Sequence, residues 1–194
     1  MAAGVHYDDP FKEEKELYAV ETGYRYKGGF NLDIEGLPKG KEIPVLCPLF
    51  LDFAERKAYV VVNLKVYERA TSGTTSVKIH KGSFAKVGGK YMLAKSNYIE
   101  VSAIDTSNEE YDVLTVRETS AEIAAGAVLT EANVSGSSAT AVRSATALNY
   151  ARTKIEEGAT VTALGRAYEI KEAELLVPLT AADKASLSSR FMFV

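Results

Sequence analysis

The sequence predicts a mostly β protein, built as β-sandwich, β-barrel or β-clip-like modules with one or two short helices. Three observations carry this prediction. Apolar and polar residues alternate from Tyr24 onward, turn residues recur between short apolar runs, and a glycine-centred pattern typical of tight turns occurs three times. With 194 residues, of which 46% are apolar, the chain is long enough for one large core or two small ones.

The first 23 residues are expected to form an N-terminal arm. Up to Leu17 they are mostly charged or polar and offer little to a core. From Tyr24 to Ile34 every second residue is apolar or small, which predicts a half-buried strand. Because such a polar arm buries too little surface to offset its ordering entropy, residues before about Phe30 are expected to be mobile in the free protein.

Two apolar segments, 43–53 and 58–67, predict a pair of core strands. The charged stretch 54–57 between them suits a hairpin turn. Pro44 and Pro48 share one parity in the first segment. Since proline cannot donate a hydrogen bond to a ladder, that strand is expected to present both prolines at an edge or a bulge.

The middle of the chain predicts two further hairpins. Gly88-Gly89 is a tight-turn signal between 84–87 and 90–93. A polar stretch over 105–110 joins the strands predicted over 98–104 and 111–117.

The last third of the chain mixes several signals. A strand is predicted over 127–130, and a Ser/Ala/Thr-rich stretch over 134–144 predicts a flexible loop. A helix over 139–157 is left open, because its apolar spacing is near-helical but Thr and Ser are frequent. Strands are predicted over 161–170, 174–179 and 191–194, and Thr180 with Asp183 predicts the capped start of a short helix ending near Leu187. The whole region 24–194 is expected to be β-rich, with two possible modules, 24–117 and 118–194.

Three seven-residue segments share an aliphatic residue, a glycine three positions later and a second aliphatic residue three positions after that. Their glycines are Gly40, Gly126 and Gly158. We interpret each glycine as the residue of a tight turn that needs positive φ before a strand. The alternative is chance, because glycine turns are common in β proteins.

Composition excludes several classes of function. The formal net charge is −3 and no basic run occurs, which argues against nucleic-acid binding. Cys47 is the only cysteine, so it cannot form an internal disulfide, and its apolar surroundings predict a small buried hydrophobe. No apolar run is long enough for a membrane span or resembles a signal peptide, so the protein is expected to be made in a cytoplasm.

The sequence offers no catalytic or metal-binding constellation. His6 and His80 lie far apart and have no cysteine nearby, which argues against a metal site. Gly88-Gly89-Lys90 lacks the spacing of a phosphate loop, and 105–110 lacks the glycine of a calcium loop. Some pair of the 26 acidic residues could meet in space, but no pair stands out. We therefore expect no enzyme activity, no metal and no cofactor.

A family resemblance rests on several short segments. Gly126-Ala127-Val128-Leu129-Thr130 resembles the "aGtvLt" element of small phage head decoration proteins, which also occurs in β-clip domains. The layout over 37–130 resembles auxiliary capsid or head-fibre proteins of tailed phages that infect gut Bacteroidetes. The resemblance implies a structural virion protein that binds the lattice of the major capsid protein and has no enzyme activity or cofactor. The chain departs from the smallest decoration proteins in its larger size and its polar N-terminal segment.

This resemblance implies a set of contacts and a location. The partners would be the major capsid protein and other head proteins, with the chain oligomeric in the particle and no contact with nucleic acid or membrane. The protein would be made in the host bacterial cytoplasm and end in the virion. The expected partner-binding residues are Tyr18, Tyr24, Tyr26 and Phe30, which offer large contact area at low entropy cost, and Arg25, which would pair with carboxylates at the rim.

Two other functions stay open. A carbohydrate- or host-surface-binding β module of a phage fibre would show exposed aromatic platforms in a groove. A small β-barrel enzyme would show a buried acid pair with perturbed titration. A flat, extended surface would favour the capsid protein.

Overall fold

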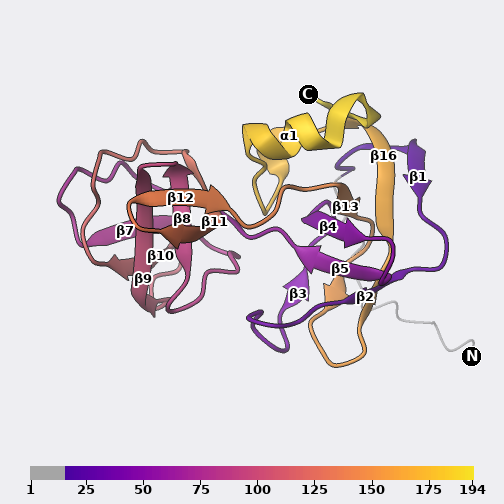
Figure 1. The fold of residues 1–194 in the computed structure, drawn as a ribbon. Helices are drawn as coiled ribbons and strands as arrows, with labels where there is room; N and C mark the ends of the chain where they lie inside the picture. Colours follow the sequence, from indigo (N-terminus) through magenta and orange to yellow (C-terminus); the bar gives the residue numbers. More distant parts are fainter. Residues whose placement is uncertain (1–15) are drawn as a thin grey trace, which may run out of the picture.

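The strands of the protein form two lobes that lie side by side (Figure 1). The computed structural model describes residues 16–194. We call residues 63–141 the inserted lobe, and residues 16–62 with 142–194 the terminal lobe. One α-helix, α1 (Ala181–Leu187), occurs in the described part of the chain, together with two short 3₁₀ helices. The prediction of a mostly β protein is confirmed.

The terminal lobe is built on an eight-stranded sheet that curves into a half-barrel. Seven strands follow one another across the sheet, and β17 (Phe191–Phe193) pairs in parallel with β16. Two shorter strands, β3 (Glu42–Ile43) and β14 (Thr153–Lys154), form a separate ladder. The order across the sheet is β1 (Ala19–Arg25), β16 (Ala163–Ile170), β13 (Ala147–Asn149), β4 (Pro48–Asp52), β5 (Lys57–Val60), β2 (Phe30–Leu32) and β15 (Thr160–Val161).

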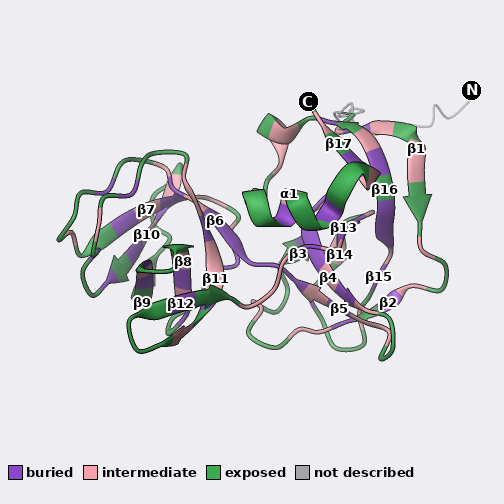
Figure 2. Cartoon of the chain, turned by 45° about the horizontal axis from the view of Figure 1, so that its top comes forward, coloured by how far each residue is buried: buried purple, intermediate pink, exposed green. Residues whose placement is uncertain are grey.

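The inserted lobe is a seven-stranded sheet that nearly closes into a barrel. Closure comes from β6 (Asn63–Lys65), which pairs with β11, while the next residue, Val66, bridges Ile79 at the opposite end of the sheet. Both lobes carry buried residues along their strands (Figure 2). The remaining strands lie in the order β12 (Ser138–Ala141), β11 (Val128–Ser135), β8 (Lys90–Ala94), β9 (Asn97–Asp105), β10 (Tyr111–Val116) and β7 (Ser76–His80).

Two of the predicted hairpins are confirmed. β4 pairs with β5 from Leu49↔Val60 to Asp52↔Lys57, and β9 pairs with β10 across the 105–110 turn. The expectation for Pro48 is wrong, because β4 lies inside the sheet between β13 and β5. Pro48 is tolerated there as the first residue of the strand, where its carbonyl accepts a hydrogen bond from Val61 N at 2.9 Å.

The three patterned glycines occupy similar turns. Gly40, Gly126 and Gly158 have φ of 82°, 78° and 77°, and strands β3, β11 and β15 begin two residues after them. In each turn the residue after the glycine donates its N–H to the carbonyl three residues earlier, for example Ala127 N to Ala124 O at 3.2 Å. Positive φ at the third position is the requirement of a type II turn, which glycine meets without a steric penalty.

The predicted N-terminal arm does not extend to residue 23. Residues 1–15 lie outside the described part of the chain, but Ala19–Arg25 forms β1 and pairs with β16. Tyr18 is only 6% exposed and lies in the terminal-lobe core, and Leu17 O accepts a hydrogen bond from Lys171 N. The expectation of an arm up to residue 23, mobile as far as Phe30, is therefore wrong for residues 17–30. The reason is that β16 supplies the hydrogen-bond partner that this polar strand needs.

The strand predicted from Tyr24 to Ile34 is also interrupted. Gly28 and Gly29 have φ of 84° and 60°, and they separate β1 from β2. The alternation survives only in β2, where Phe30 and Leu32 are buried and Asn31 is exposed. The two left-handed glycines turn the chain, a local feature that the apolar periodicity does not reveal.

Two predictions in the inserted lobe need correction. Gly88-Gly89 lies in a turn, but the strand predicted before it, over 84–87, does not form. The strand after the turn, β8, pairs instead with β9, the next strand along the chain. The main chain before the turn is held by other partners, since Lys86 N donates to Tyr91 Oη at 3.0 Å. The predicted flexible loop over 134–144 contains the hairpin of β11 and β12 around Gly136.

In the terminal lobe, the structure answers the open question of a helix over 139–157, and one predicted strand does not form. No helix forms over 139–157, because all three residues of β13 are buried between two strands: Leu148 is paired with both Pro48 and Leu164. The segment 174–179 is not a strand: Glu174 ends the 3₁₀ helix Glu172–Glu174, and 175–179 are irregular chain. The helix α1 is confirmed, with Thr180 as its N-cap and a complete capping box to Asp183. The strand at 191–193 is confirmed as β17.

The sheets do not divide at residues 117/118, where the two possible modules would meet. Strands on both sides of that point share one sheet, because β11 pairs with β6 and β8. Likewise β4 and β16 flank β13 in the other sheet. The chain therefore leaves the terminal lobe after Val62 and returns to it near Val142.

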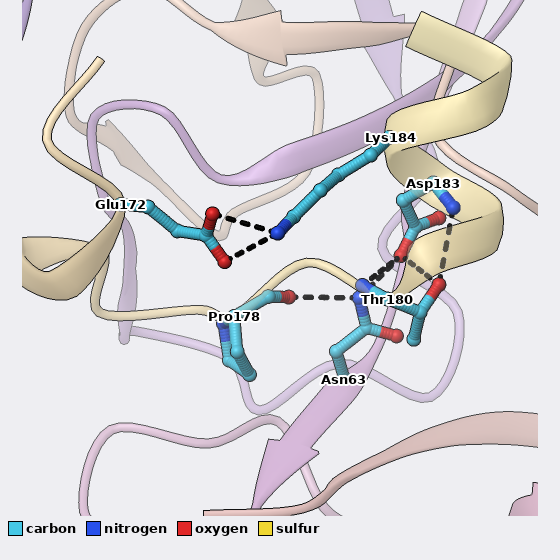
Figure 3. A network of polar contacts seen from close by, with 6 residues as sticks. All are labelled: Asn63, Glu172, Pro178, Thr180, Asp183 and Lys184. Carbon is cyan, nitrogen blue, oxygen red and sulfur yellow. Dashed lines mark hydrogen bonds and ion pairs between the residues drawn. The ribbon is translucent and has the colours of Figure 1, made fainter. Parts of the chain in front are cut away.

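A buried carboxylate lies where the chain crosses between the lobes (Figure 3). Asp183 of α1 is 1% exposed and accepts hydrogen bonds from Asn63 Nδ2 and Ala145 N, both at 2.8 Å. Asn63 begins the outgoing connection and Ala145 lies on the returning one. The same carboxylate accepts from Thr180 N at 2.9 Å and from Thr180 Oγ1 at 2.7 Å. One side chain therefore ties α1 to both crossing segments.

In the part of the chain that the structure describes, no helix has the length and apolar character needed to cross a membrane.

Candidate functional site

Four aromatic rings gather on one surface of the terminal lobe, and we call Tyr24, Tyr26, Phe30 and Phe53 the aromatic face. Tyr26 is central: its ring centroid lies 5.8 Å from Tyr24, 6.3 Å from Phe30 and 5.2 Å from Phe53. All three contacts are edge-to-face, the geometry that aromatic pairs prefer. Two rings of the face, Tyr24 and Phe53, are each 52% exposed.

Arg56 holds the loop between β1 and β2 against this face. Its guanidinium lies 4.3 Å from the ring centroid of Phe30, and Nη2 donates to the carbonyls of Lys27 and Gly29, both at 2.7 Å. A Cβ at Gly28 would lie 2.8 Å from the same Nη2. Arg56 therefore fixes the backbone of the loop, and the aromatic face is held in one arrangement before any partner arrives.

Tyr26 is fixed from behind by β16 and by the chain after α1. Its hydroxyl accepts a hydrogen bond from Arg190 Nη1 at 3.2 Å. Its ring lies directly over Gly165, where a Cβ would come within 2.7 Å of the ring. A side chain at position 165 would therefore displace the central ring of the face.

An open hollow of about 460 Å³ adjoins the face and is lined by 23–29 and Thr162. Among its described lining residues are two cations, Arg25 and Lys27, and no carboxylate. Arg25 lies 4.6 Å over the ring of Tyr150 and forms no ion pair with any residue of the described range. The hollow therefore combines exposed aromatic surface with positive charge.

The five expected partner-binding residues have different positions. Tyr24 and Arg25 are exposed and Tyr26 is half-buried, and all three line the same open hollow. Phe30 is 1% exposed and supports the face from below, while Tyr18 belongs to the core. The corrected surface set is Tyr24, Arg25 and Tyr26, with Phe30 behind it and Tyr18 removed.

Sequence reasoning missed Phe53. It was assigned to an apolar strand, but it follows β4 at the start of the 53–56 turn and is half exposed. Its place as an aromatic residue directly before the charged stretch 54–57 was the sequence signal that could have indicated exposure. Only the ring contacts with Tyr26 and Phe30, at 5.2 and 5.4 Å, show that it joins the face.

Reactive groups elsewhere have ordinary structural environments. Burial raises the pKa of the Cys47 thiol, which keeps it protonated and unreactive. Burial and the charge of Lys65 lower the pKa of His80, whose ring contacts Tyr67 at 5.1 Å. Within residues 16–194 no group of three or more His, Cys, Asp or Glu is placed to hold a metal ion.

The acidic loop 105–110 is a plain turn. Asp105 Oδ1 accepts from Ser107 N at 2.9 Å, and this bond lowers the pKa of Asp105. Asn108 Oδ1 accepts from Glu110 N at 2.8 Å. These side chains bond to their own backbone, as Asx turns do.

Comparison with protein-family models, with curated proteins and with solved structures found no match to this chain.

Proposed function

We propose that this chain is a structural virion protein, an auxiliary capsid protein that binds the major capsid protein lattice through its aromatic face. The observation that carries the proposal is the pair of half-exposed rings, Tyr24 and Phe53, on a backbone already fixed by Arg56. Tyr and Arg dominate the energetics of protein interfaces, and rigid rings bury large area at little entropy cost. The family resemblance supplies the identity of the partner.

The charges around the aromatic face suit a role in guiding the protein to its partner rather than in holding the complex together. Arg25 and Lys27 lie at its exposed rim. Such rim cations accelerate association with an acidic surface and are screened by salt. Association with capsids should therefore slow as salt rises, whereas dissociation should depend on the rings.

The experiment is co-sedimentation with empty capsids of a tailed phage of gut Bacteroidetes, assembled without auxiliary proteins. The double variant Tyr24→Ala/Phe53→Ala should weaken binding by about thirtyfold, because each truncation removes half-exposed ring area from the interface centre. Leu176→Ala is the matched control, since Leu176 is 65% exposed but does not belong to the face. Its binding should stay within about threefold of the wild type.

Two results would contradict the proposal. If the wild-type protein does not sediment with capsids, the capsid function is wrong. If it sediments but the double variant binds equally well, the aromatic face is not the interface.

A carbohydrate-binding module of a phage fibre is the second candidate. The same exposed rings beside an open hollow would offer a stacking platform for a sugar. Saturable binding of a neutral oligosaccharide, lost in the double variant and unaffected by capsids, would favour this function over the first.

A further inference from the structure

A second polar cleft, of about 270 Å³, lies between the two lobes and apart from the aromatic face. The loop 33–37 and the end of β5 line it from the terminal lobe, and Lys86, Glu131 and Asn133 line it from the inserted lobe. Arg143, on the returning connection, completes it. The loop and the inserted lobe approach closely, because a Cβ at Gly36 would lie 3.0 Å from Lys86 Nζ.

Arg143 is the unusual residue of this cleft. Its guanidinium lies 4.0 Å from the ring centroid of Tyr59 and 5.9 Å from that of Phe50, on the paired strands β5 and β4. The side chain is half-buried, yet it makes no hydrogen bond or ion pair with any residue in the 16–194 range. A half-buried arginine normally finds an acceptor, since its five N–H donors lose water on burial. Stacking therefore holds a planar donor group in place while its edge stays available.

The other charges of the cleft define the ligand further. Lys86 Nζ is paired with Glu131 Oε1 at 2.7 Å, which leaves Arg143 as the cation without a partner. Asp33 and Glu35 add two carboxylates to the lining, so a highly charged anion such as phosphate would be repelled. Carboxylates and the Asn133 amide are instead good partners for hydroxyl groups.

We propose that this cleft binds a small hydroxylated carboxylic acid, with the chemistry of a uronic acid. The ligand carboxylate forms a bidentate pair with Arg143, the geometry that a guanidinium fork matches. Ligand hydroxyls donate to the carboxylates of Asp33 and Glu35. The cleft volume lies just below the range of about 300–1,000 Å³ of sites for drug-sized ligands, which suits a single sugar ring. This inference does not depend on the capsid proposal, because it uses a different surface.

The test is a titration of the purified full chain with glucuronate, in which binding is measured by calorimetry and by changes in amide chemical shifts. Glucose, acetate and inorganic phosphate are the comparison ligands. Glucuronate should bind saturably and shift amides in the 33–37 loop and near Arg143. The comparison ligands, which lack either the carboxylate, the hydroxyl groups or the low charge, should each bind at least about tenfold more weakly.

Variants separate binding from folding. Arg143→Gln should weaken glucuronate binding by at least about tenfold, whereas Arg152→Gln, the same change at an exposed arginine outside the cleft, should change it by less than about twofold. Arg143→Lys keeps the charge and the stem but loses the fork, so it should also weaken binding, and it serves if the glutamine variant does not fold. No saturable glucuronate binding, equal binding of acetate or phosphate, or unchanged affinity in both Arg143 variants would overturn the proposal.

Discussion

Replacing Asp183 with alanine should cost about 2–6 kcal/mol of the free energy of unfolding. Its buried carboxylate accepts four hydrogen bonds: one each from Asn63 Nδ2 and Ala145 N, and two from Thr180. Truncation leaves the N–H groups of Ala145 and Thr180 without this acceptor, at about 1–3 kcal/mol each where they stay buried. The other half of the capping box, from Asp183 N to Thr180 Oγ1, uses a backbone donor and survives the substitution. The total is a large fraction of the roughly 5–15 kcal/mol typical of a protein of this size.

Urea denaturation followed by circular dichroism measures this cost. Lys184→Ala is the control, because Lys184 lies on the same helix and pairs with Glu172 at 2.6 Å, but both side chains are more than a third exposed. Exposed pairs contribute about 1 kcal/mol or less, so this variant should lie close to the wild type. A cost below about 1 kcal/mol for Asp183→Ala, measured with an unchanged m-value, would refute the reasoning that one carboxylate secures the lobe junction.

Three further predictions concern titration and backbone. Burial raises the pKa of Tyr91 to about 12, so the native state keeps its proton where the unfolded state loses it; stability should be constant below about pH 10 and fall by about 2–3 kcal/mol between pH 10 and 12. Tyr91→Phe should flatten this part of the wild-type stability curve, and an unchanged slope would contradict the assignment. Replacing Gly40, Gly126 or Gly158 with alanine should each cost about 1 kcal/mol of the free energy of unfolding. The cost comes from positive φ alone, since a Cβ at these positions meets nothing within 4 Å. Three variants with unchanged stability in urea denaturation would contradict the turn argument. Gly165→Ala should displace the Tyr26 ring, visible as changed aromatic proton shifts, and an unperturbed ring spectrum would show that the contact is loose.

The features that sequence reasoning placed correctly are those in which the deciding residues are neighbours along the chain. The capping box needs only Thr180 and Asp183, and the turn over 105–110 needs only side chains that bond to their own backbone. Partner binding by Tyr24, Arg25 and Tyr26 stays a prediction, although all three line the hollow beside the aromatic face.

The features that sequence reasoning left open or placed wrongly depend on partners far away in the chain. Leu148 has helix-compatible neighbours, but it becomes a strand residue because Pro48 and Leu164 pair with it from both sides. Tyr18 was expected to contact a partner protein, but β16 and the C-terminal segments bury it within the chain itself. The spacing of residues in the sequence carries no information about which distant strand supplies the missing hydrogen bonds.

The order of amino acids alone determines the turns, the cap of α1 and the β character of this protein, because backbone preferences and capping act over a few residues. Tertiary structure alone decides that residues 63–141 form a separate lobe, that Phe53 joins the aromatic face, and that Arg143 stands over Tyr59 without an acceptor. Each of these features arises when segments distant in the chain bury apolar surface and satisfy main-chain hydrogen bonds together, an energy that no single segment contains.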